Sequence, residues 1–93
     1  MENEISEIKL KKYFEVTGKA LEKAKKHIHK KAKKEAEIIL DMAERYYKDA
    51  DYFRKQGNYV NAFGALNYAH GWLDTGSKLG IFDIKDNKLF VVK

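Results

Sequence analysis

Residues 46–82, YYKDADYFRKQGNYVNAFGALNYAHGWLDTGSKLGIF, decide the fold. On both sides of Gly57 the apolar residues recur every three to four positions, as they do along one face of a helix. Gly57 suits the left-handed position after a helix end, and Asn58 suits the cap of the next helix. The stretch therefore predicts two antiparallel helices joined by a tight turn.

The sequence before this stretch predicts a further helix and extends the second one. Residues 5–28 carry apolar side chains over about half of a helical circumference, and residues 36–56 continue the pattern up to the turn at Gly57. A single helix over 5–56 would be about 75 Å long and could not pack on itself. We therefore expect a break near residues 29–34. Helix three is expected to run from residue 59 to 79.

The last residues change in character. Two apolar runs, Ile81-Phe82-Asp83-Ile84 and Leu89-Phe90-Val91-Val92, flank the turn-like Lys85-Asp86-Asn87-Lys88 and predict a short β-hairpin over 81–93. An isolated hairpin is marginally stable in water, so it is expected to lie against the bundle or to pair with another chain. The predicted fold is mainly α: one domain over 1–93, a three-helix bundle with a C-terminal β-hairpin.

Composition excludes several classes of protein. The 93 residues include no cysteine, which rules out disulfides and Cys-based zinc sites. No segment approaches the roughly 20 apolar residues that span a bilayer. The N-terminal MENEISEIK lacks the apolar run of a signal peptide. These features predict a cytoplasmic protein with no membrane contact.

The positive charge is concentrated in one segment. Residues 19–34 contain eight lysines and one glutamate, a local charge of +7, whereas the whole chain carries +5. The remainder therefore sums to −2, so the basic character belongs to a patch and not to the whole surface.

Residues 46–84 closely resemble the signature of the archaeal domain-of-unknown-function family 357. Members of that family have a tyrosine-rich helix, a GDY or GNY turn, a block like NYAHGWLDAG, and then LGxFD. Here these are Gly57-Asn58-Tyr59, residues 67–76 and residues 79–83. The resemblance covers residues 44–84, and the first helix matches only in general type. It implies a small helical bundle built around an antiparallel hairpin. It implies no activity and supplies no catalytic residues.

Three polar residues share one edge of the predicted helix three. Asn67, His70 and Asp74 fall at i, i+3 and i+7, beside Tyr59. A histidine with a carboxylate can bind a polar ligand or act as a general base. Alternatively, the same residues fix the register of neighbouring helices through hydrogen bonds. This structural interpretation is the favoured one. No serine or cysteine nucleophile accompanies them, so no catalytic residue is predicted.

Aromatic residues give a second candidate surface. Trp72 points away from the main core stripe and lies near Tyr68. It either covers the terminal hairpin or anchors an interface, since tryptophan and tyrosine are enriched at binding hot spots. Several tyrosines could also line a cleft between helices two and three that binds a planar ligand.

The lysine-rich segment gives a third. Its candidate phosphate-binding residues are Lys23, Lys26, Lys30, Lys31, Lys33 and Lys34. Each neutralised phosphate would add salt-dependent affinity for nucleic acid. No known nucleic-acid-binding motif is present, and a solvated helix end is the simpler interpretation. His27-x-His29 is a weak metal signal because the two side chains diverge on a helix. No metal or cofactor is predicted.

These observations rank three hypotheses about function. The first is a non-enzymatic interaction module, a homodimer or an accessory subunit, that binds a protein partner through helix three and the hairpin. The second is nucleic-acid or phosphate binding by residues 19–34. The third is a small-ligand site around His70.

Overall fold

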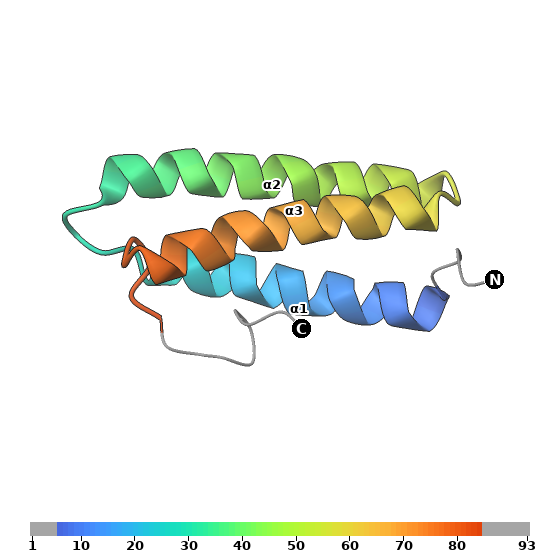
Figure 1. The fold of residues 1–93 in the computed structure, drawn as a ribbon, viewed down its shortest axis with the longest axis horizontal. Coiled ribbons are helices and arrows are strands. Elements are labelled where there is room, and N and C mark those ends of the chain that lie inside the picture. Colours follow the sequence, from blue (N-terminus) through green and yellow to red (C-terminus); the bar gives the residue numbers. More distant parts are fainter. Residues whose placement is uncertain (1–5, 85–93) are drawn as a thin grey trace.

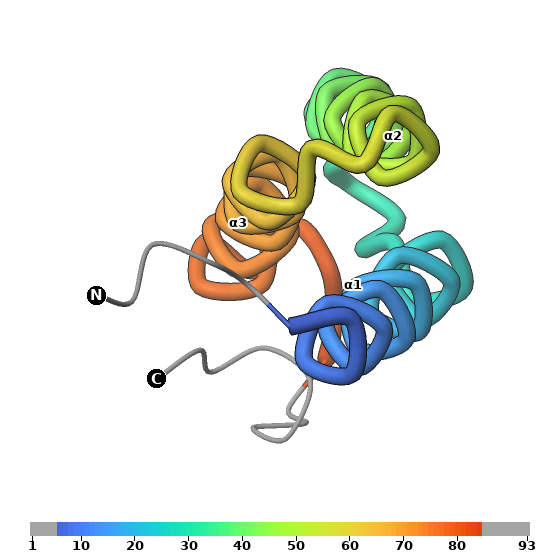
Figure 2. The backbone as a smooth tube through the Cα atoms, turned by 90° about the vertical axis from the view of Figure 1, so that its right-hand side faces the viewer, coloured from blue at the N-terminus to red at the C-terminus, as the bar shows by residue number. Residues whose placement is uncertain are grey.

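In a computed structural model, which describes residues 6–84, the chain forms a bundle of three helices. They are α1 (Glu7–Lys26), α2 (Lys33–Lys55) and α3 (Tyr59–Lys78). Helices α2 and α3 lie antiparallel and share the largest contact, and α1 contacts α3 more than α2 (Figure 1). Viewed end-on, the three helices stand at the corners of a triangle (Figure 2). The predicted helical bundle is confirmed.

The turn between α2 and α3 has the geometry that its sequence indicates. Gly57 adopts φ 76°, in the left-handed region that favours glycine. The side chain of Asn58 caps α3 by accepting a hydrogen bond from the Asn61 N–H at 3.2 Å. Ser6 caps α1 in the same way, accepting from the Lys9 N–H at 3.1 Å. Local chemistry therefore sets these two helix starts.

The break between α1 and α2 begins earlier than expected, because α1 ends at Lys26 and residues 27–32 form the linker. There the backbone pairs with the segment after α3 instead of continuing the helix. The His29 N–H donates to the Ile81 carbonyl at 2.9 Å, and the Asp83 N–H donates to the His27 carbonyl at 2.7 Å. Tertiary pairing therefore decides where α1 ends.

This pairing corrects the predicted C-terminal hairpin. Residues 81–84 form no hairpin strand; instead Phe82 makes one isolated antiparallel bridge with Ile28. The remaining hairpin residues, 85–93, lie outside the described residues. Gly80, with φ 77°, turns the chain after α3, and the Ile81 N–H donates to the Gly76 carbonyl at 2.8 Å. The chain is thereby returned across the bundle towards the linker.

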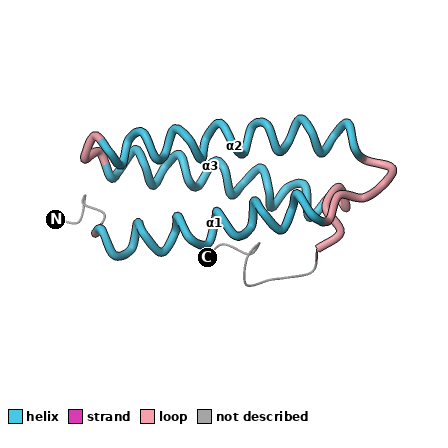
Figure 3. Tube along the Cα trace, turned by 180° about the vertical axis from the view of Figure 1, so that it is seen from behind, coloured by secondary structure: helices cyan, strands magenta, loops and turns pink. Residues whose placement is uncertain are grey.

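The buried side chains form two clusters, one at each end of the bundle. Residues 27–32 and 79–84 mark one end, called the linker end, and residues 56–58 mark the turn end (Figure 3). Phe82 is fully buried at the linker end, among Ala20, Ala24, Ile39 and Leu73. The turn-end cluster is formed by Leu10, Phe14, Ala50, Ala62, Ala65 and Leu66. Small alanines between larger residues allow the helices to approach closely.

Candidate functional site

Helix α3 has an exposed face without charge. Residues 59–73 contain no Asp, Glu, Lys or Arg, although 35% of the whole chain is charged. On this face Val60 is 53% and Tyr68 64% exposed, and open space surrounds the position of a Cβ at Gly64 and at Gly71. We define the α3 outer face as Val60, Gly64, Asn67, Tyr68, Gly71 and Thr75.

A hollow of about 420 Å³ lies on this face, where α3 meets α2. The rings of Tyr46 and Tyr68 stack beside it with centroids 5.1 Å apart and an interplanar angle of 19°. The hollow is lined by Tyr46, Asn67, Tyr68, Gly71, Trp72 and Thr75. The structure therefore brings together three of the candidates named from the sequence, Asn67, Tyr68 and Trp72.

Trp72 has two environments at once. Part of its side chain packs against the buried cluster at the linker end, and another part lines the hollow. Residue 84 packs on the same cluster. Whether Trp72 anchors an interface stays a prediction. A substitution at Trp72 would consequently change stability as well as the surface.

The polar candidates on α3 have separate environments. His70 is only 5% exposed and does not line the hollow beside Tyr68. The Asp74 carboxylate forms an ion pair with Lys78 at 3.2 Å. The Tyr59 hydroxyl donates to Glu7 at 2.7 Å, a hydrogen bond that raises the pKa of the phenol. A small-ligand site around His70 stays a prediction.

The lysine candidates fall into two groups. Lys30 and Lys31 lie exposed in the linker, and Lys33 and Lys34 begin α2. Lys23 and Lys26 instead line a groove of about 590 Å³ between α1 and α2. We call it the α1–α2 groove, and its lining is Phe14, Glu15, Gly18, Lys19, Glu22, Lys23, Lys26, His27 and Tyr47.

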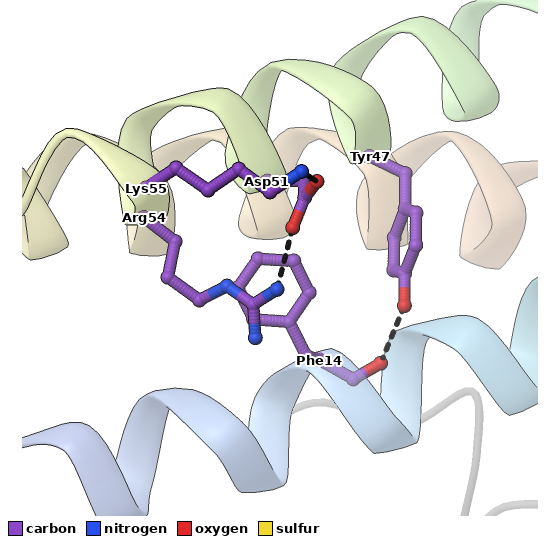
Figure 4. A network of polar contacts seen from close by, with 5 residues as sticks. All are labelled: Phe14, Tyr47, Asp51, Arg54 and Lys55. Carbon is purple, nitrogen blue, oxygen red and sulfur yellow. Dashed lines mark hydrogen bonds and ion pairs between the residues drawn. The ribbon is translucent and has the colours of Figure 1, made fainter.

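Tyr47 crosses this groove from α2 to α1. Its hydroxyl donates to the Phe14 carbonyl at 3.2 Å, and its ring meets the Phe14 ring edge-on at 5.6 Å (Figure 4). Burial raises the pKa of the Tyr47 phenol, the Arg54 charge lowers it, and Asp51 raises it again. A Cβ at Gly18 would lie 2.8 Å from the Tyr47 hydroxyl oxygen, so a glycine allows the crossing.

Arg54 packs on the Phe14 ring and is held there by Asp51. The guanidinium of Arg54 lies over this ring, 4.7 Å from its centroid, and donates to Asp51 at 2.6 Å (Figure 4). Hydrogen bonds from Lys55, at 3.1 Å, and from Arg54 lower the pKa of Asp51. This network joins α2 to α1 near the turn end.

The two linker histidines have defined tautomers. His27 Nδ1 lies 2.8 Å from the Lys23 carbonyl oxygen, which only accepts, so Nδ1 carries the proton. His29 Nδ1 accepts from the Lys31 N–H at 3.1 Å, which places the proton on Nε2 of the neutral ring. The two rings therefore present different atoms to a ligand. Within residues 6–84 no three metal-binding side chains gather.

The aromatic lining of the α1–α2 groove does not follow from the sequence pattern. Periodicity assigns Phe14 to the core and Tyr47 to the centre of an apolar stripe. The available signal is a glycine inside the first helix, since Gly18 marks a place where another side chain comes close.

None of the helices among residues 6–84 has a stretch apolar and long enough to cross a bilayer.

Comparisons with known proteins identify the family. A search of curated protein sequences and a search of solved structures both found no match. The family model described as a protein of unknown function (DUF357) matches residues 12–82, which include all of α2 and α3 and most of α1. The chain therefore belongs to the DUF357 family of proteins of unknown function.

Proposed function

We propose that this protein acts by association and not by catalysis, and that the α3 outer face is its contact surface. The observation that carries the proposal is the missing charge: α3 lacks charged residues from 59 to 73 while its outer face remains exposed. The cores of protein interfaces are depleted of charge and enriched in aromatic residues. Tyr46, Tyr68 and Trp72 supply those aromatics.

The occupant that fits this face is a second copy of the chain. Most soluble oligomers are homo-oligomers, and a two-fold contact brings the same patch of both subunits together without requiring opposite charges. Gly64 and Gly71 lie on either side of Asn67 and Tyr68 along one stripe. If two α3 helices cross antiparallel near Asn67, each Gly64 faces the partner's Gly71. Small residues at both positions then permit a close approach.

The two-fold arrangement is tested by introducing cysteine, because the natural chain has none. Asn67→Cys places a thiol near the proposed axis, where the two Cα atoms can come within about 7 Å, the reach of a disulfide. Mild oxidation should convert this variant to a covalent dimer. Lys12→Cys, at an exposed position on α1 outside the proposed contact, is the matched control and should form no covalent dimer.

Association itself is measured by sedimentation over a wide range of protein concentration. Gly71→Glu puts a charge into the face and also replaces a helical glycine, which should stabilise the monomer by roughly 0.5–1 kcal/mol. The Gly71→Glu monomer should therefore unfold at a higher temperature than the parent monomer, but the variant should associate more weakly. Ile8→Glu adds the same charge at an exposed position on α1 and should leave association unchanged.

Two results would overturn the proposal. One is a parent protein that sediments as a monomer at every concentration. The other is a parent dimer that Gly71→Glu does not weaken, because that dimer would use a different surface. The thermal stability of Gly71→Glu is measured alongside. If the variant is stabilised but associates as well as the parent, the new charge lies on the helix surface but outside the interface, which is the second of these results.

A further inference from the structure

The α1–α2 groove carries positively charged side chains at regular intervals. Lys19, Lys23 and Lys26 lie along one side of α1, and at 1.5 Å of rise per residue they span about 10 Å. Glu15 and Glu22 also line the groove, so its lysines exceed its glutamates by one. All three groove lysines belong to segment 19–34, whose net charge is +7, so the groove lies in a positive field.

Lys19 and Lys26 differ from a neighbouring lysine that serves the fold. Lys25 forms ion pairs with Glu44 on α2 and with Glu22, and the hydrogen bond to Glu44 is the main reason that its pKa is raised. Among residues 6–84, by contrast, no carboxylate forms an ion pair with Lys19 or Lys26. Their charge is available to an anion.

Aromatic and histidine side chains complete the groove. Phe14 and Tyr47 form its wall towards the turn end, and His27 lines it towards the linker end. Because His27 Nδ1 donates to the Lys23 carbonyl, only Nε2 remains for a ligand. The lining thus combines cations for phosphates with the half-buried ring of Tyr47, against which a base can pack. Cations and an aromatic ring together bind nucleotides in single strands.

We infer that the α1–α2 groove binds the phosphate groups of a nucleotide ligand, with its base towards the ring of Tyr47. The source is either a free nucleotide or a single-stranded RNA, which share this chemistry. The site is formed by Lys19, Lys23, Lys26 and His27, and the exposed lysines at positions 30, 31, 33 and 34 lie outside it. It is separate from the α3 outer face, so binding does not require the proposed dimer.

The experiment compares two variants with the same change in charge. In the groove variant Lys19, Lys23 and Lys26 become glutamine, and in the linker variant Lys30, Lys31 and Lys33 become glutamine. The probe is a fluorescent single-stranded RNA of about 12 nucleotides, enough to cover such a groove. Its anisotropy is measured with increasing salt, and thermal unfolding confirms that both variants fold. ATP, tripolyphosphate and unlabelled RNA then compete with the probe.

Three phosphate contacts should lower the affinity of the parent by roughly 20-fold between about 50 and 200 mM salt. The groove variant should bind about tenfold more weakly than the parent at the lower salt, with a shallower salt dependence, and the linker variant should lose much less. Competition by ATP supports a free nucleotide as the source, and competition by RNA alone supports a single strand.

Three outcomes contradict the inference. If both variants lose affinity equally, binding follows the overall charge and not the groove. If the parent binds neither ATP nor RNA, the groove has another role. If both ATP and tripolyphosphate displace the probe, and equally well, the aromatic wall contributes nothing and the base is not recognised.

Discussion

The ring of Phe82 lies against the backbone of Gly76, so that a Cβ at residue 76 would come within 2.7 Å of Phe82 Cδ2. Phe82 is fully buried, and the same Cβ would lie 3.4 Å from Ile39 Cδ1, so an added methyl group has little room. The glycine in the block GWLDTG is therefore needed for packing.

Gly76→Ala should destabilise the protein. Overpacking of a core costs about 1–3 kcal/mol, which exceeds the roughly 1 kcal/mol gained by replacing a helical glycine with alanine. Gly64→Ala, on the same helix, meets open space within its own chain and should stabilise the monomer instead, measured at a protein concentration at which the parent does not associate. Urea unfolding of the two variants measures this difference. Equal stabilisation by both would show that the Phe82 ring can move aside.

Phe82→Ala should lower the free energy of unfolding by about 3–5 kcal/mol, as expected for a buried phenylalanine. It should also expose the backbone pairing at the linker end, because the ring fixes residues 81–83 beside the linker. Amide hydrogen exchange at His29 and Asp83 measures this pairing. If both amides stay protected in the variant, the backbone bonds hold without the ring.

Tyr47→Phe removes the hydrogen bond between the Tyr47 hydroxyl and the Phe14 carbonyl and should cost about 1 kcal/mol at neutral pH. The pKa of this phenol is raised on folding, so the stability it contributes is complete below its unfolded value of about 10. That contribution is lost as the pH rises through the folded pKa. Raising the pH above about 10 should therefore lower the free energy of unfolding of the parent more than that of Tyr47→Phe.

The control for that measurement is Tyr52→Phe, at an exposed position on α2. It should match the parent protein at both neutral and alkaline pH. An identical pH dependence in the parent and Tyr47→Phe would mean that Tyr47 does not couple its ionisation to unfolding.

Asp51→Asn should destabilise the protein by a few tenths of a kcal/mol at pH 7, since Asp51 is 36% exposed and water screens its ion pairs. Its pKa is lowered on folding, chiefly by the hydrogen bond from Lys55. The stabilisation is therefore present above the unfolded pKa of about 3.9 and is lost as the pH falls through the folded value.

The free energy of unfolding of the parent and of Asp51→Asn should thus converge in acid. Thermal or urea unfolding from neutral pH to about pH 2 measures the convergence, a range that includes the carboxylate titration. A gap that stays constant over the whole range would assign the effect of the substitution to something other than the carboxylate charge.

The helices could be predicted because their signals are local. Period and capping residues mark α1 and α3, and Gly57 marks the turn with its left-handed φ. The prediction for the segment 81–84 is wrong for the opposite reason. Its alternating Ile81, Phe82 and Ile84 do suit extended backbone, but its partner is the linker at residues 27–29, which no neighbouring residue indicates.

The candidate surfaces were predictable to different degrees. Asn67, Tyr68 and Trp72 follow one another along one helix, so their proximity in the hollow follows from helical spacing. The α1–α2 groove depends on how two helices cross, because Lys23 and Tyr47 come from different helices. Periodicity assigns each residue to a face of its helix, but it does not determine where two packed helices leave a groove between them.

The pairing of residues 27–29 with 81–83 joins distant parts of the chain. Closing so long a loop costs more entropy than forming the α2–α3 turn, whose ends are neighbours. The α2–α3 pair should assemble first, and the contact between the linker and residues 81–83 should form last. Weakening that contact should then accelerate unfolding and leave the refolding rate nearly unchanged. The lifetime of the folded molecule should therefore depend on a few backbone bonds at one end of it.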